Sequence, residues 1–76
     1  SPQFAAHTLA VADVAVEVFV ATYRDDFDLL ELEAEPECWR EFQNPGGGRE
    51  WLKPDLFLVT ANTDTESHLF VEVDLG

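Results

Sequence analysis

Two apolar runs near the end of the chain, LFLVT at residues 56–60 and HLFVEV at residues 68–73, decide the fold. Apolar side chains occupy both alternating positions of each run, which is typical of strands that are covered on both faces. The polar stretch 61–67 is short enough to join them as an antiparallel hairpin. Matching the apolar faces sets the register. It places Leu56 and Leu58 opposite Leu69, Val71 and Val73.

The long apolar segment 9–23 predicts a helix that covers this sheet. Residues 14, 16, 18 and 20 are all valines and alternate as in a strand, but a length of about 15 residues favours a helix. The residues that follow helical spacing are Leu9, Ala12, Val16, Phe19, Val20 and Tyr23. Because the segment is apolar on most sides, we expect a sheet on one face and a partner, or a missing part of the protein, on another.

The segment 28–34 alternates apolar and acidic residues and predicts a half-buried strand. We expect Leu30 and Leu32 on one face of this strand and Glu31 and Glu33 on the other.

Residues 35–37, Glu-Pro-Glu, predict a short helical turn with Pro36 in its first positions and with Trp39 and Phe42 as buried contacts. The Asn-Pro-Gly-Gly-Gly stretch at 44–48 predicts a flexible loop that serves as a hinge or linker. The expected fold class is therefore α/β (α+β): a helix followed by a mostly antiparallel β-meander.

The hairpin register gathers three carboxylates at one end of the sheet. Asp55 precedes the first strand, Glu72 and Asp74 end the second, and the antiparallel pairing brings them together on the face of His68. Three like charges at one place repel each other, and a divalent cation would offset this cost. Mg²⁺ or Mn²⁺ suits carboxylate and water ligands. The spacing of these residues also allows an alternative, in which the strand end is exposed and the three acids are only solvated.

The string Lys53-Pro54-Asp55, a strand, a turn and Phe70-Val71-Glu72-Val73-Asp74 resembles the PD…(D/E)xK signature of restriction-endonuclease-like nucleases. Taken together, the order and spacing of four motifs resemble the replication-relaxation family, whose members are found on plasmids and other mobile elements. These motifs are His7-x-Leu9-Ala10-Val11-x-Asp13-Val14, Glu35-Pro36-Glu37-x-Trp39-Arg40, Leu52-Lys53-Pro54-Asp55 and Phe70-Val71-Glu72-Val73-Asp74-x-Gly76.

This resemblance implies a restriction-endonuclease-like core in which Asp55 and Glu72 are metal ligands and Glu17 lies near a supporting acid position. Asp74 stands where the signature has its catalytic Lys, and Lys53 could substitute for that Lys in space only if its side chain turns toward the acids. The family pattern tends to have Arg at the position of Leu75. The candidate catalytic residues are Asp55, Glu72, Asp74 and Lys53, and the candidate metal ligands are Asp55, Glu72 and Asp74.

The resemblance also implies a role in DNA replication or transfer, with DNA contacted through the full-length protein. It leaves open whether the chain is an active enzyme. The chain has no Met and stops at Gly76 directly after a strand-like run. We therefore expect residues 1–76 to be a single, partial nuclease-like domain that is truncated at its C-terminus.

The charge balance is strongly acidic, with 16 Asp and Glu against 4 Lys and Arg and a net charge of −12. Such a surface repels phosphate backbones, so tight DNA binding by these residues alone is disfavoured. The excess serves either solubility or cation binding. No run approaches the roughly 20 apolar residues that a membrane span requires, and no signal peptide is visible, so we expect a cytoplasmic protein with no membrane partner.

The remaining candidates have ordinary structural explanations beside functional ones. Trp39 and Trp51 could stack on bases or simply pack, and His7 and His68 could be metal ligands or merely satisfied or exposed histidines. The single cysteine, Cys38, excludes an internal disulfide and is expected to be a buried thiol. A second hypothesis is a catalytically inert interaction or oligomerisation domain, in which the helix face and a sheet edge pair with another copy or with a missing part of the protein.

Overall fold

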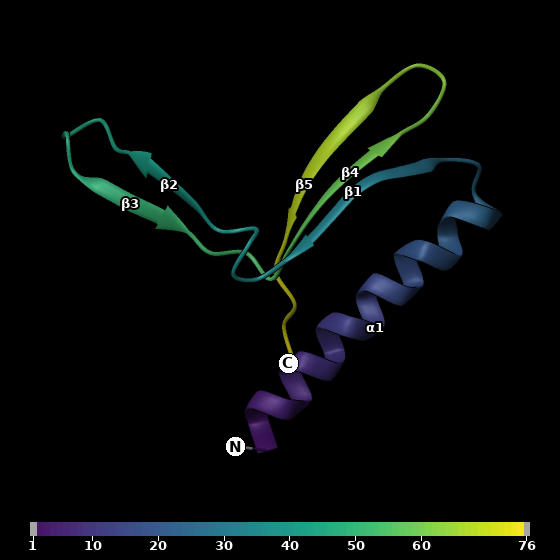
Figure 1. Cartoon of the computed structure of the whole chain (residues 1–76), viewed down its shortest axis with the longest axis horizontal. Helices are drawn as coiled ribbons and strands as arrows, with labels where there is room; N and C mark the ends of the chain where they lie inside the picture. The colour runs from purple at the N-terminus through teal and green to yellow at the C-terminus, as the bar shows by residue number, and fades with distance from the viewer. Residues whose placement is uncertain (1, 76) are drawn as a thin grey trace.

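A computed structural model describes residues 2–75 and shows an α+β fold, in which one N-terminal helix is followed by antiparallel strands in two sheets (Figure 1). The elements of this range are α1 (Pro2–Arg24), β1 (Asp28–Ala34), β2 (Arg40–Gln43), β3 (Arg49–Leu52), β4 (Leu56–Ala61) and β5 (Glu66–Val71). The larger sheet has the order β1-β4-β5, and β2 pairs with β3 in a separate hairpin. The prediction of a helix followed by an antiparallel β-meander is confirmed.

The β4–β5 hairpin has the register that its apolar pattern predicts. Leu56 lies opposite Val71, and Leu58 lies opposite Leu69. The side chain of Asn62 closes the turn, because its Oδ1 accepts hydrogen bonds from the backbone N–H groups of Asp64 and Thr65, both at 2.9 Å. β5 begins and ends two residues earlier than predicted, so that residues 72 and 73 lie beyond its end.

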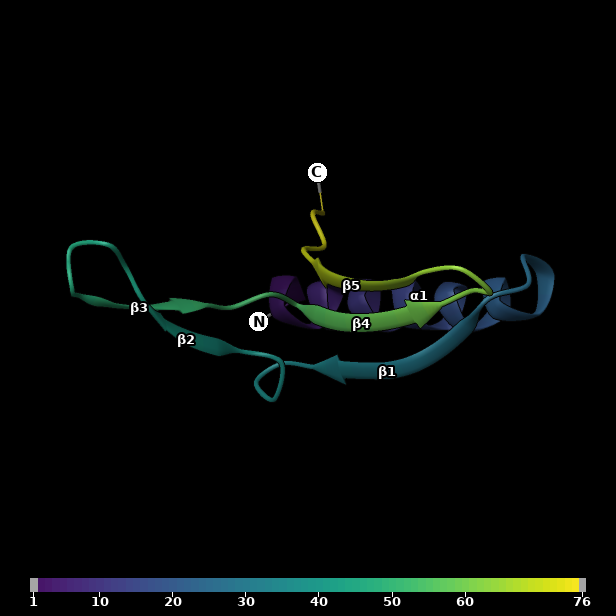
Figure 2. The same cartoon turned by 90° about the horizontal axis from the view of Figure 1, so that it is seen from above.

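Helix α1 lies along one face of the three-stranded sheet and runs antiparallel to β1 (Figures 1 and 2). The residues at 7, 11, 14, 18 and 21 are half-buried, and their spacing of three and four is that of one helical face. The helical spacing found in the sequence belongs instead to the outward face. Its large members are all more than half exposed: Leu9, Val16, Phe19, Val20 and Tyr23.

A cavity of about 370 Å³ lies between the C-terminal half of α1 and the sheet, with Val18, Phe27, Leu58 and Leu69 in its lining. The helix has no buried residue. The two layers are therefore packed loosely along this half.

Strand β1 has the predicted bounds, but its faces are not those expected. A β-bulge shifts the register between Leu29 and Glu31, so that Leu30 is an extra residue without a partner on β4. Leu29 and Leu32 are half-buried, whereas Leu30 is 56% exposed. The expectation that Leu30 and Leu32 share a face was wrong because the bulge interrupts the simple alternation.

The segment after β1 forms a turn over residues 35–38 and then a strand, not a short helix. Trp39 is half-buried as expected, but Phe42 lies exposed on β2. Residues 44–48 close the β2–β3 hairpin, so the expectation of a hinge or linker was also wrong. Asn44 organises this turn: its backbone N–H donates to Gly48 O at 2.8 Å and its Oδ1 accepts from Gly48 N at 3.0 Å, while Gly47 has a positive φ of 88° that suits glycine.

The buried core is small and comprises Leu56, Phe57, Leu58 and Val59 of β4 together with Cys38. Cys38, Phe57 and Val59 pack together, with Trp39 against them. The Arg40 guanidinium lies 5.3 Å from the Phe57 ring centroid and 2.8 Å from Glu33 Oε1. The β2–β3 hairpin extends away from the rest of the chain (Figure 1). As a result the radius of gyration is 14.6 Å, against about 11.4 Å for a compact chain of this length.

Helix α1 is long and apolar enough, by length and composition, to cross a membrane, with a mean hydropathy of 1.7. The expectation that no run approaches the length of a membrane span was therefore wrong for this helix, whose apolar residues are interrupted by Asp13 and Glu17. A helix with protein on two faces has the same composition, and each acid would cost about 2.5–3.5 kcal/mol at the centre of a bilayer. The absence of a membrane partner stays a prediction.

Candidate cation site

The structure brings two acidic side chains, those of Glu35 and Asp55, together at one end of the three-stranded sheet. Strand β1 ends at Ala34, which lies opposite Leu56, the first residue of β4. Glu35 and Asp55 are the next residues outward on the two strands, so the antiparallel register makes them neighbours. The end of β5 lies at the same place, because Val71 is also paired with Leu56.

Helix α1 supplies a third side chain to this end of the sheet, the imidazole of His7. From Arg24 back to His7 the helix covers about 26 Å, at about 1.5 Å per residue. The seven residues of β1 cover about 23 Å, at about 3.3 Å per residue. Because the two elements run antiparallel, these lengths place His7 level with the end of β1.

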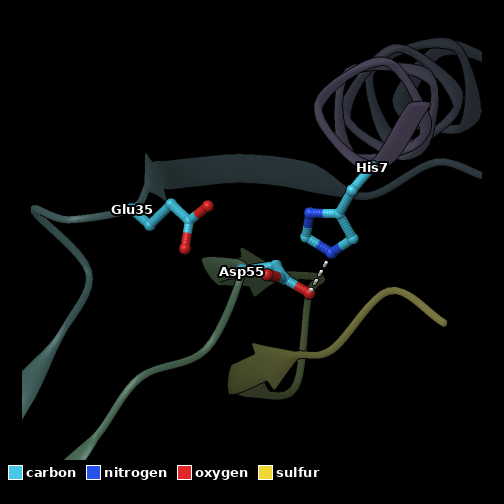
Figure 3. A group of neighbouring side chains, drawn as sticks. All are labelled: His7, Glu35 and Asp55. Atoms are coloured by element: carbon cyan, nitrogen blue, oxygen red, sulfur yellow. Dashed lines mark ion pairs between the residues drawn. The ribbon is translucent and has the colours of Figure 1, made fainter. Parts of the chain in front are cut away.

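His7, Glu35 and Asp55 each turn a potential ligand atom toward the same space (Figure 3). Nε2 of His7 lies 3.3 Å from Oδ2 of Asp55. One ligand atom from each of the three residues lies within 4.8 Å of the other two. The group combines one imidazole with two carboxylates, a donor set that suits divalent metal ions.

Asp55 is the buried member of the group and is only 7% exposed. Its Oδ2 accepts a hydrogen bond of 2.7 Å from the backbone N–H of Val73, and its own N–H donates to Val71 O at 3.0 Å. These bonds fix the carboxylate between β4 and the segment that follows β5.

Of the other predicted site residues, Glu72 and Asp74 flank Val73, so the structure brings their backbone next to Asp55. Their side chains are exposed and are not part of the group formed by His7, Glu35 and Asp55. Strand alternation no longer fixes their direction, because β5 ends at Val71. Asp55 also lies before β4 begins, and it meets α1 rather than sharing the face of His68.

Lys53 extends toward Trp39 and not toward the acids, with its Nζ 5.0 Å from the Trp39 ring centroid. The three arginines of the chain also have partners elsewhere: Arg24 with Asp25, Arg40 with Glu33 and Arg49 with Glu41. Within residues 2–75, none of the four basic side chains forms an ion pair with Asp55. His7 is its cationic partner when the imidazole is protonated.

Cys38 supports the loop that carries Asp55. It is fully buried, and its Sγ donates to the carbonyl oxygen of Pro54 at 3.3 Å. Burial raises the pKa of the thiol, with Glu35 among the charges that add to this effect, so the group stays protonated and uncharged near neutral pH. The prediction of a buried thiol is confirmed.

His7 was considered in the sequence as a possible ligand, and Glu35 was not. Each is the first residue of one of the four motifs quoted above. These motifs are spread over the whole chain, and in the structure they meet at this end of the sheet. Membership of the quoted motifs is therefore the sequence feature that could have identified both His7 and Glu35. Glu17, the possible supporting acid, is exposed on α1 and is not part of the group.

No curated protein and no solved structure matches the chain. The resemblance to PD-(D/E)xK nucleases therefore remains a prediction. The family model described as replication-relaxation matches residues 1–76, which is the whole sequence. The chain therefore belongs to the replication-relaxation family, whose description indicates a role in replication-related processes.

Proposed function

We propose that this chain is a nuclease-like domain of a replication-relaxation protein that acts in the replication or transfer of plasmid or mobile-element DNA. In this proposal a carboxylate site centred on Asp55 binds a divalent cation, Mg²⁺ or Mn²⁺. The observation that carries the proposal is the position of Asp55, a nearly buried carboxylate at the end of a sheet where further ligand atoms gather. Buried charges in proteins are generally paired or coordinate metals.

Glu72 and Asp74 are the further carboxylates of the proposed site. They lie on either side of Val73, which is bonded to Asp55, and their side chains are exposed. In this proposal both side chains turn toward Asp55 when a cation binds. A cation held there would lower the pKa of a bound water and offset negative charge on a phosphate group.

The basic groups of the chain limit what the site can do alone. The signature Lys is replaced by Asp74, and Lys53 lies against Trp39. A cation that stabilises the charge developing on a phosphate is therefore not supplied by these side chains in this arrangement. With a net charge of −12, contact with DNA needs basic groups from elsewhere in the full-length protein. We expect no cleavage by this chain alone.

Cleavage of supercoiled plasmid DNA by the full-length protein tests this function. With Mg²⁺ or Mn²⁺ the wild-type protein is expected to yield nicked or linear DNA, and the Asp55→Asn variant is expected to yield neither. Asp28→Asn is the matched control, since it removes the same charge at the opposite end of the sheet, where Asp28 lies opposite Ala61. Equal cleavage by wild-type and Asp55→Asn protein would exclude Asp55 as the centre of the activity.

A second candidate function is a catalytically inactive interaction or oligomerisation domain on the same fold. The outward face of α1 favours it, because Leu9, Val16, Phe19 and Tyr23 are exposed at the three- and four-residue spacing that pairs helices. Tyr23 alone is 87% exposed. Contiguous apolar surface of this kind marks interaction sites.

Light scattering tests this second function. If a second copy covers this face, the wild-type chain is dimeric and Val16→Glu makes it monomeric. Gln3→Glu adds the same charge at an exposed polar position of the helix and is expected to leave the dimer intact. A wild-type chain that is monomeric at every concentration would argue against self-pairing.

A further inference from the structure

We propose that His7, Glu35 and Asp55 bind a transition-metal dication, with Zn²⁺ preferred over Mg²⁺, and that this ion fastens α1 to the end of the three-stranded sheet. The inference builds on the proposed cation site at Asp55, but it assigns different ligands and does not depend on nuclease activity. Its basis is the group of ligand atoms from α1, the end of β1 and the start of β4 (Figure 3).

The separation of the first two ligand atoms fits a tetrahedral centre. Zinc binds imidazole nitrogen and carboxylate oxygen at about 2.0–2.1 Å, so two of its tetrahedral ligands lie about 3.3 Å apart. Nε2 of His7 and Oδ2 of Asp55 are 3.3 Å apart. The two atoms already have the spacing that one bound ion requires.

Glu35 completes the group with a modest adjustment. Its ligand atom lies within 4.8 Å of the other two, so an approach of about 1–2 Å brings it to the tetrahedral ligand spacing. Glu35 is exposed, and a rotation about its side-chain bonds covers this distance without moving the sheet. The fourth ligand position remains for water.

The chemistry of the three donors determines which ion is preferred. Mg²⁺ prefers oxygen ligands in octahedral geometry and gives up its water reluctantly. An imidazole with two carboxylates suits Zn²⁺ and other transition-metal ions, which bind nitrogen and oxygen together. The nitrogen of His7 therefore shifts the preference away from the magnesium expected from the carboxylates alone.

The protein positions the central ligand in advance. The backbone N–H of Val73 donates to Asp55 Oδ2, and the thiol of Cys38 donates to the carbonyl oxygen of Pro54, the preceding residue. Bonds of this kind orient metal-binding carboxylates and strengthen metal binding.

The ion would join two layers that are loosely packed. Helix α1 has no buried residue, and a cavity separates its C-terminal half from the sheet. His7 lies in the N-terminal half, where a bond to the metal ties the helix to both β1 and β4. Metal bound only to the folded chain stabilises it, and a concentration 100-fold above the Kd raises the Tm on the order of 10 °C.

Calorimetric titration with Zn²⁺ and with Mg²⁺, together with thermal unfolding, tests the inference. The ligand variants are His7→Gln and Glu35→Gln, and a double variant, Glu72→Gln with Asp74→Asn, removes the alternative carboxylates. His68→Gln is the matched control, because His68 forms a similar pair with Glu66 at 2.9 Å on the exposed surface of β5. His7→Gln retains a polar side chain that can hydrogen-bond to Asp55, and circular dichroism confirms that each variant is folded.

We expect Zn²⁺ to bind the wild-type chain and to raise its Tm. Its affinity should fall at least tenfold in His7→Gln and in Glu35→Gln, and remain unchanged in His68→Gln and in the double variant. Zinc binding that survives His7→Gln overturns the inference. If magnesium binds and requires Glu72 and Asp74, and zinc does not bind, the zinc site is also overturned. The proposed function remains intact in that case. If neither ion binds, both proposals fail.

Discussion

Nε2 of His7 lies 3.3 Å from Oδ2 of Asp55, and this pair joins the N-terminal half of α1 to the residue that precedes β4. The partners differ in burial, since the Asp55 side chain is 11% exposed and the His7 side chain 31%. The contact matters because α1 contributes no buried residue to the core. It makes the end of the sheet both a candidate cation site and a point that holds the two layers together.

Replacement of His7 by alanine is expected to lower the free energy of unfolding by about 1 kcal/mol in the absence of metal, because Asp55 loses its ionic partner. His68→Ala, in which an exposed His–Glu pair is lost, should cost less than about 0.5 kcal/mol. Urea denaturation of both variants measures the difference. Equal effects would show that the His7–Asp55 pair contributes no more than a surface contact.

Asp55→Ala is expected to lower the free energy of unfolding by about 1–3 kcal/mol, since the backbone N–H of Val73 loses its acceptor. Asp55→Asn should cost less, because the amide oxygen of asparagine can still accept this hydrogen bond. Urea denaturation of the metal-free variants provides the comparison. The critical result is which of the two variants loses more stability. If Asp55→Asn were less stable than Asp55→Ala, this hydrogen bond would not be the main contribution of Asp55 to folding.

The β4–β5 hairpin could be predicted because the short polar stretch 61–67 joins two apolar runs, and matching Leu56 and Leu58 to the face of Leu69 and Val71 gives the observed pairing. The helix could be predicted from the length of its apolar segment. Strands β2 and β3 were missed because each has only four residues, nearly all of them exposed, so they carry no period-two burial signal. The bulge at Leu30 was missed for a related reason: an extra residue in a strand leaves no mark on the pattern until the partner strand is known.

The candidate site was predictable only in part. Asp55 could be placed at the end of the sheet, because the hairpin register determines which residues border it. The role of His7 depends on how a helix far away in the sequence returns along β1, which local periodicity does not specify. Glu72 and Asp74 lie beyond the last paired residue of β5, where the rule of alternating faces no longer applies.

The pKa of Cys38 predicts a loss of stability at alkaline pH. Burial raises this pKa in the folded chain, whereas the thiol of the unfolded chain titrates near its ordinary value of 9.0. As the pH rises above that value, the unfolded chain releases a proton that the folded chain retains, so the free energy of unfolding falls. The stabilising effect is fully present below pH 9 and is lost as the pH rises through the raised pKa.

Urea denaturation across this pH range, for the wild-type chain and for Cys38→Ala, isolates the contribution of the thiol from those of other groups. The wild-type chain should lose stability more steeply than the variant. In the native state near neutral pH, Cys38 should also react with iodoacetamide only as fast as the chain unfolds. Rapid labelling under those conditions would contradict the burial of the thiol.

Leu56→Ala is expected to lower the free energy of unfolding by about 2–5 kcal/mol, because Leu56 is 1% exposed on β4, the central strand of the three-stranded sheet. Leu30→Ala makes the same chemical change at the exposed bulge of β1 and should cost less than about 1 kcal/mol. Thermal or urea unfolding of the pair tests the position of the core. Similar losses at both sites would mean that Leu30 is covered in solution.

The most direct test of the central claim, a divalent cation bound at Asp55, is calorimetric titration of the chain with Mn²⁺. Manganese accepts carboxylate oxygens and also imidazole nitrogen, so the result does not depend on which residues complete the site. We expect manganese to bind stoichiometrically to the wild-type chain and to Asp28→Asn, and not to bind to Asp55→Asn. Binding that persists in Asp55→Asn, or a wild-type chain that binds no manganese, would contradict it.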